Sequence, residues 1–137
     1  MRLFFDTSAF LKRYIEEPGS IEVEELCKQA EDVAVSMLFP IEAVSALSRL
    51  FSTKVITLSD KRRIKKNLFD DLRDITIIPL SLSTVAFSIR TIESSAIKTL
   101  DAAHVGCAME FKPDFFVSSD KQQTAAAHAA GLRVKLI

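Results

Sequence analysis

Arg2-Leu3-Phe4-Phe5-Asp6-Thr7-Ser8 is the stretch of sequence that decides the fold. Its short apolar run, which Asp6 ends, is typical of a buried strand. Thr7 or Ser8 can then act as the N-cap of a helix that continues to Tyr14. The stretch therefore predicts a strand that passes at once into a helix.

The rest of the chain repeats this order of strand and helix. We expect further strands over residues 33–35, 75–78, 114–117 and 133–137. We expect further helices over residues 21–30, 40–50, 61–73, 83–94, 100–110 and 121–130. Ser59-Asp60 is expected to cap the helix over 61–73, and Thr99 the helix over 100–110. Because strands that alternate with helices form parallel sheets, the pattern predicts a single three-layer α/β domain with a mostly parallel central sheet flanked by helices.

The composition is that of an ordinary globular protein. Of the 137 residues, 48% are apolar and 26% are charged. Two separate cores in a chain of this length would each be marginal, so we expect one domain over residues 1–137. Cys27 and Cys107 form no CxxC pair, which favours buried thiols in a reducing compartment. No apolar run reaches the ~18 residues that a membrane span requires, and we expect a cytoplasmic protein.

The charge balance limits how the chain can bind nucleic acid. Its 18 basic and 18 acidic residues cancel, so any basic surface for RNA or DNA must be gathered locally. The densest basic run is Lys61–Lys66. A solvated helix face is the favoured interpretation of this run, because Asp70, Asp71 and Asp74 offset its field, and a phosphate-binding surface is the alternative.

Four acidic residues occupy positions that an α/β fold brings to one edge of the sheet. Asp6 and Asp120 come at or just after the ends of expected strands, and Glu42 and Asp101 lie in the first turns of expected helices. In such sheets, ligands bind beyond the carboxyl ends of the strands. Carboxylates held together as bare anions would repel one another and raise one another's pKa values. A divalent cation removes this conflict, and hard oxygen ligands suit Mg²⁺ or Mn²⁺.

Such a metal site predicts hydrolysis of a phosphodiester. A bound cation can activate a water and stabilise the charge that develops on the phosphate. Ser8 and Ser118, each close in sequence to an aspartate, can orient a carboxylate or a metal-bound water. Taken singly, each acidic residue can equally be a helix cap or a first-turn residue that interacts favourably with the helix dipole. The hypothesis of a metal site therefore depends on all four residues together.

At these positions the chain resembles the PIN-domain nucleases, and among them the VapC-type toxins of toxin–antitoxin pairs. The matching segments occur in the family's order and at family-like spacing over nearly the whole chain. They are Phe5-Asp6-Thr7-Ser8-Ala9, Ile41-Glu42-Ala43-Val44-Ser45-Ala46-Leu47, Leu100-Asp101-Ala102-Ala103-His104, Val117-Ser118-Ser119-Asp120 and Ala129-Ala130-Gly131-Leu132-Arg133-Val134.

The resemblance implies a Mg²⁺- or Mn²⁺-dependent endoribonuclease, usually a homodimer, that a small antitoxin protein inhibits. The family's acidic quartet falls onto Asp6, Glu42, Asp101 and Asp120 as metal ligands and catalytic residues, with Ser8 and Ser118 as supporting hydroxyls. Many PIN domains carry a further acidic residue two positions after the last aspartate. This chain has Gln122 there, which leaves the occupation of a second metal site open.

Two further features keep alternatives open. His104 follows Asp101 by three residues and shares its helix face; a structural histidine is the favoured interpretation, and a group that orients a carboxylate or moves protons is the alternative. His128 is assigned no role. Apolar side chains at helical spacing can form either core or a groove for a second copy or an antitoxin, and these are Phe10, Leu11, Tyr14, Leu47, Leu50 and Phe51.

The sequence disfavours two other classes of function and leaves a third open. A phosphohydrolase with an aspartyl nucleophile needs a second Asp two residues after the first, and position 8 is Ser. A receiver-like phosphoacceptor domain needs an acidic pair before the Asp of the first strand, and Met1-Arg2-Leu3 supplies none. The alternative that stays open is a non-catalytic PIN-like module that binds RNA or a protein.

Overall fold

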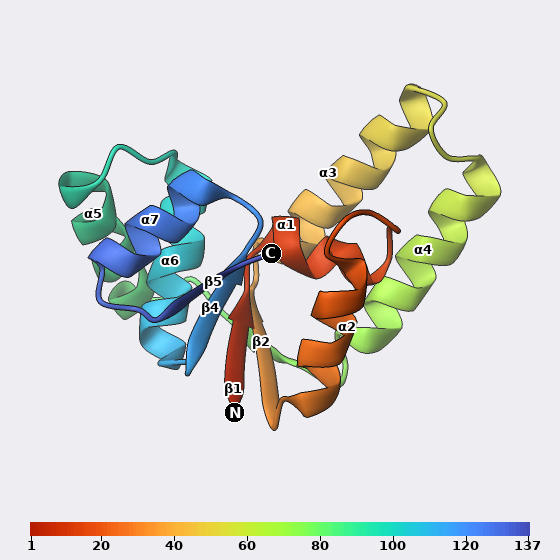
Figure 1. Ribbon diagram of the computed structural model, residues 1–137. Helices are drawn as coiled ribbons and strands as arrows, with labels where there is room; N and C mark the ends of the chain where they lie inside the picture. The colour runs from red at the N-terminus through yellow and green to blue at the C-terminus, as the bar shows by residue number, and fades with distance from the viewer.

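A five-stranded parallel sheet forms the centre of the structure, a computed structural model that describes residues 1–137 (Figure 1). The strands are β1 (Arg2–Phe5), β2 (Asp32–Ser36), β3 (Thr76–Ile78), β4 (Phe115–Ser118) and β5 (Val134–Leu136). Their order in the sheet is β3-β2-β1-β4-β5, and all four pairings are parallel. The expected α/β class is thus confirmed, and the sheet is wholly rather than mostly parallel.

Helices cover both faces of this sheet. They are α1 (Thr7–Phe10) with the 3-10 turn η1 (Leu11–Arg13), α2 (Ser20–Gln29), α3 (Phe39–Ser52), α4 (Leu58–Asp71), α5 (Leu82–Ser94), α6 (Thr99–Phe111) and α7 (Lys121–Ala129). In Figure 1, α1 to α4 lie on one side of the sheet and α5 to α7 on the other. The three-layer prediction is therefore correct. No helix is both long enough and apolar enough to cross a membrane.

Alternation along the strands builds two separate cores. Leu3 and Phe5 of β1 face α1 to α4, and Phe4 between them faces α6 and α7. Phe4 stacks on Phe116 of the neighbouring strand, with 5.9 Å between ring centroids. Of the apolar positions left open by the sequence, Phe10 and Leu47 are fully buried and belong to the core, whereas Phe51 is exposed.

α6 is buried on nearly every side, which explains why it carries no amphipathic pattern. Its close approach to α5 depends on Gly106. A Cβ at that position would lie 2.1 Å from Oγ of Ser88 and 2.6 Å from the carbonyl oxygen of Thr84. The tight packing of α6 against α5 fixes the helix whose first turn carries Asp101.

Three helix starts differ from the prediction. Asp6, not Thr7 or Ser8, caps α1, because its carboxylate accepts the N–H of Ala9. α4 begins with a capping box of Thr57 and Asp60, one turn before the expected Ser59-Asp60 cap. Thr99 is the first residue of α6 and provides no cap; Lys98 holds the N-cap position without a side-chain hydrogen bond.

Candidate active site

The four acidic residues lie at the carboxyl edge of the sheet, where β1 and β4 end. A pocket of about 440 Å³ opens there, between the residues that follow these strands and the first turns of α3 and α6. Glu42, Asp101 and Asp120 line this pocket, as do Thr7 and Ser8. Asp6 does not line the pocket and is 1% exposed. The structure thus brings three of the four expected carboxylates to one cavity and buries the fourth beside it.

Asp6 sits in a shell of hydrogen-bond donors. Its Oδ1 accepts from Oγ of Ser8 at 2.8 Å and from the N–H of Ala9 at 2.9 Å, and its Oδ2 accepts from Oγ of Ser118 at 2.5 Å. Burial raises the pKa of the Asp6 carboxyl above its ordinary value, although these hydrogen bonds act in the opposite direction. Ser8 thus contacts the aspartate nearest to it in sequence, whereas Ser118, which is nearest to Asp120, donates to the carboxylate of Asp6.

The two serines also join the chain segments that carry Asp6 and Asp120. Oγ of Ser8 accepts the N–H of Ser119 at 3.1 Å, and Oγ of Ser118 accepts the N–H of Asp120 at 2.9 Å. Asp120 then caps α7, with its Oδ1 accepting from the N–H groups of Gln122 and Gln123. This network sets the position of Asp120, which is exposed at the rim of the pocket.

Glu42 is held by two donors within the wall of the pocket. Its Oε1 accepts from Oγ1 of Thr7 at 3.0 Å and forms a hydrogen bond with Nε2 of His104. Burial alone would raise the pKa of Glu42, but the hydrogen bonds from His104 and Thr7 outweigh it and hold the pKa below its ordinary value. Glu42 is therefore a carboxylate at neutral pH.

Asp101 is the carboxylate of the pocket that lacks a partner. Its side chain takes part in no hydrogen bond or ion pair, and only its carbonyl oxygen is engaged, by Nε2 of Gln123 at 3.2 Å. Burial raises the pKa of Asp101, and the neighbouring charges of Asp120 and Glu42 raise it further. Asp101 is thus a half-buried carboxyl group whose pKa two neighbouring carboxylates raise, which is the repulsion that the sequence predicted.

The donor set fits a hard divalent cation. The carboxylates and hydroxyls around the pocket supply only oxygen ligands apart from His104, whose nitrogens are both engaged. The unpartnered Asp101 beside Asp120 and Glu42 is the group that a cation would stabilise. No three of the chain's His, Cys, Asp and Glu side chains lie close enough together to hold a metal ion by themselves.

Four residues of the site were not assigned to it from the sequence. Thr7, expected only as a cap, donates to Glu42, and Gln123 links the starts of α6 and α7. Arg49 is the one basic residue that lines the pocket. It follows Glu42 by seven residues on α3, a spacing that returns to the same helix face and could have revealed it. Ser36 contacts His104 and belongs to no motif.

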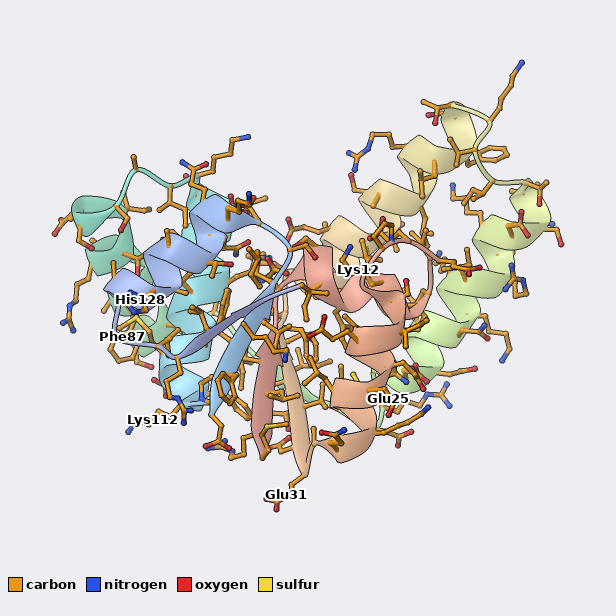
Figure 2. The ribbon with its side chains drawn as sticks, viewed as in Figure 1. Lys12, Glu25, Glu31, Phe87, Lys112 and His128 are labelled. Atoms are coloured by element: carbon orange, nitrogen blue, oxygen red, sulfur yellow. The ribbon has the colours of Figure 1, made fainter.

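Other sequence features lie away from the pocket. The basic run Lys61–Lys66 is on α4, where Lys66 pairs with Asp70 and Arg63 pairs with Asp60, as expected for a solvated face. Gln122 donates from Nε2 to the carbonyl oxygen of Ala96 at 2.6 Å. His128 is exposed near the C-terminal end of α7 (Figure 2), whereas the pocket lies at the N-terminal ends of α6 and α7.

The sequence matches a known protein family over most of its length. The model of the PIN domain matches residues 3–129, and the chain belongs to the PIN-domain family. No curated protein matches the chain in sequence.

Solved structures share the fold at low sequence identity. FitAcB from Neisseria gonorrhoeae is 16% identical, with a TM-score of 0.74 over 96% of this chain and 95% of that chain. VapBC2 from Rickettsia felis, bound to a DNA fragment from its promoter, is 15% identical, with a TM-score of 0.73 over 100% and 99% of the two chains. A toxin–antitoxin complex from Klebsiella pneumoniae is 14% identical, with a TM-score of 0.69 over 90% of each chain.

Proposed function

We propose that this PIN-domain protein is a divalent-metal-dependent endoribonuclease and the toxin of a toxin–antitoxin pair. The observation that carries the proposal is the convergence of Glu42, Asp101 and Asp120 on one pocket, with Asp6 buried beside it. PIN domains are typically nucleases, and the fold is shared with the toxin–antitoxin complex from Klebsiella pneumoniae. The site chemistry and the family membership thus support the same reaction class.

In this proposal, Asp6, Glu42, Asp101 and Asp120 would hold Mg²⁺ or Mn²⁺ together with water ligands, because no three of these side chains lie close enough together to hold it alone. When bound, such a cation would lower the pKa of a coordinated water and stabilise the charge that develops on the phosphate. Ser8 and Ser118 keep the buried Asp6 carboxylate oriented, and Thr7 does the same for Glu42. Because its pKa is held low, Glu42 is available either as a ligand or as the base that accepts a proton from water.

Arg49 is proposed to bind a phosphate of the RNA. It lines the same pocket as the three carboxylates, and it takes part in none of the ion pairs of the structure. A guanidinium can contact a phosphate with two parallel N–H groups. Arg49 would thus supply positive charge at the pocket itself, although the chain as a whole has no excess of basic residues.

The proposed partners are an antitoxin protein and a second copy of this chain. Ile41 and Leu100 line the pocket as exposed apolar side chains, a surface that an inhibitory protein would cover.

The exposed face of α5 carries Leu82, Val85, Ile89 and Ile92 at helical spacing, with Leu82 92% exposed. We infer that this face is the homodimer interface. Light scattering should show a dimer that Ile89→Glu dissociates.

The direct experiment is cleavage of a mixed pool of single-stranded and structured RNAs by the purified protein. It is run with Mg²⁺, with Mn²⁺ and with EDTA, beside a single-stranded DNA of matched length. We expect RNA cleavage that requires either metal and stops in EDTA.

An enzyme of this kind would act in the cytoplasm, which agrees with the free thiols of Cys27 and Cys107.

The non-catalytic alternative is separated by the same assay. A protein that binds RNA with the same affinity in EDTA and never cleaves it would be a PIN-like binding module. Cleavage of the DNA in preference to RNA would keep the nuclease and overturn the substrate class.

A further inference from the structure

We infer that His104 is a positioning residue that, held by Ser36, fixes the carboxylate of Glu42 in the pocket. The inference rests on the proposed function, because it assigns Glu42 a place in the reaction. It adds to the carboxylates a buried chain of hydrogen bonds that begins at Ser36, at the end of β2.

The three side chains come from three different elements. Ser36 is the last residue of β2, His104 lies one turn into α6, and Glu42 lies in the first turn of α3. Oγ of Ser36 is 3.0 Å from Nδ1 of His104, and Nε2 of His104 contacts Oε1 of Glu42. Ser36 is 0% exposed and His104 1% exposed. The serine and the ring are therefore almost completely shielded from bulk water.

The neighbours of Ser36 decide how the histidine is protonated. Oγ of Ser36 already accepts the N–H of Leu38 at 3.1 Å. Its own proton has one acceptor within reach, Nδ1 of His104, and a buried hydroxyl left without an acceptor would be costly. Ser36 therefore donates to Nδ1, which leaves the ring proton on Nε2.

This tautomer is the one that Glu42 requires. A carboxylate can only accept hydrogen bonds, so Nε2 must donate to Oε1. The hydrogen bonds then run in one direction, from Leu38 through Ser36 and His104 to Glu42. The donation leaves Oε2 of Glu42, which no side chain of the structure engages, for other contacts in the pocket.

The same arrangement separates this role from ordinary packing. A histidine that merely filled space would not need a serine to set its tautomer or a carboxylate to receive its proton. Carboxylates at metal sites are held by hydrogen bonds of this kind, and loss of such a partner typically lowers metal affinity or activity by about 10–100-fold.

The first test is independent of catalysis. In the metal-free protein, ¹⁵N chemical shifts of the imidazole report which nitrogen carries the proton. We expect protonated Nε2 and bare Nδ1 in the wild type, and a shift of the Nδ1 resonance in Ser36→Ala. A wild-type ring with bare Nε2 would overturn the inference, because such a ring cannot donate to Glu42.

The second test uses paired substitutions of His104. His104→Gln keeps an N–H near the position of Nε2, and His104→Asn keeps one near the position of Nδ1. We expect His104→Asn to lower kcat and Mn²⁺ affinity by about 10–100-fold with little change in KM for RNA, and His104→Gln to retain most of both. The exposed His128→Gln is the matched control and should behave as wild type.

Rates are expressed per folded molecule, with the folded fraction measured by circular dichroism. Equal losses in His104→Asn and His104→Gln would contradict the positioning role, because only one of the two removes the donor to Glu42. If the wild-type protein neither cleaves RNA nor binds Mn²⁺, the proposed function fails, and the ¹⁵N measurement still decides the Ser36–His104–Glu42 chain of hydrogen bonds.

Discussion

Oγ of Ser118, at the end of β4, donates a 2.5 Å hydrogen bond to Oδ2 of Asp6, which follows the end of β1. The two residues are 112 positions apart in sequence and meet because β1 and β4 are neighbours in the sheet. The backbone adds a second link, from the N–H of Asp6 to the carbonyl oxygen of Val117 at 3.1 Å. Strand pairing therefore positions the buried carboxylate on which the proposed site depends.

Asp6→Asn should abolish cleavage and leave the fold intact. The amide keeps an oxygen for Ser8 and Ala9, and its NH₂ can donate to Ser118, whose hydroxyl has a second acceptor in the carbonyl oxygen of Asp120 at 3.4 Å. Cleavage assays and circular dichroism check the two halves of this prediction. Full activity in this variant would remove Asp6 from the site.

The stability of the same variant should depend on pH in a defined direction. Because burial raises the pKa of Asp6 in the folded state, ionisation destabilises the wild-type fold as pH rises through that raised pKa. Asp6→Asn lacks this group. In EDTA, its free energy of unfolding relative to wild type should therefore increase from acidic to neutral pH, as urea titrations can measure. A constant difference would show that Asp6 is not perturbed.

Asp120→Asn should lower the pKa of Asp101. After burial, the charge of Asp120 is the largest cause that raises this pKa, and the substitution removes the charge while keeping the shape. A ¹³C titration of the Asp101 carboxyl in the metal-free protein measures the change. An unchanged pKa would mean that the two carboxylates are too far apart to share a cation.

Arg49→Gln should weaken RNA binding with little effect on kcat. Loss of one phosphate contact should raise KM and lower the slope of log K against log salt by about 1. Lys65→Gln, in the exposed basic run of α4, is the control. An equal effect of both substitutions would instead favour the alternative in which that run binds phosphates.

Gly106→Ala should destabilise the fold although Ala is the better helix former. The propensity gain of ~1 kcal/mol is smaller than the overpacking cost of about 1–3 kcal/mol. The added Cβ would meet both Oγ of Ser88 and the backbone carbonyl oxygen of Thr84. Urea denaturation should show a lower free energy of unfolding, which a second substitution, Ser88→Ala, restores only in part. Unchanged stability would contradict the close packing of α5 and α6.

Local patterns were sufficient to predict the order of strands and helices. Most of the strands have a short β-branched or aromatic run, and the alternation with helices leaves a parallel sheet as the consistent architecture. The same logic correctly predicted that Glu42, Asp101 and Asp120 share one edge of the sheet. These features depend on spacing along the chain, which the sequence contains.

Contacts between distant side chains were harder to predict. Ser36 has no neighbour in sequence that indicates a role, and its partner His104 lies 68 residues away. His104 and Asp101 line the same pocket, as their shared helix face predicted, but the carboxylate that His104 contacts is Glu42 of another helix. Asp6 was expected either as a helix cap or as a residue of the site, and its one carboxylate follows β1, accepts the N–H of Ala9 in α1 and lies beside the pocket. Such double roles depend on rotamers that only the packed structure fixes.

The central claim is that the carboxylates of the pocket cleave RNA with a bound divalent cation. The most direct measurement is the single-turnover rate of RNA cleavage in Mg²⁺ for Asp101→Asn beside Asp70→Asn, an exposed carboxylate of α4 that pairs with Lys66. We predict that Asp101→Asn loses cleavage as completely as wild type does in EDTA, while Asp70→Asn keeps the wild-type rate. A wild-type rate in Asp101→Asn would contradict the account.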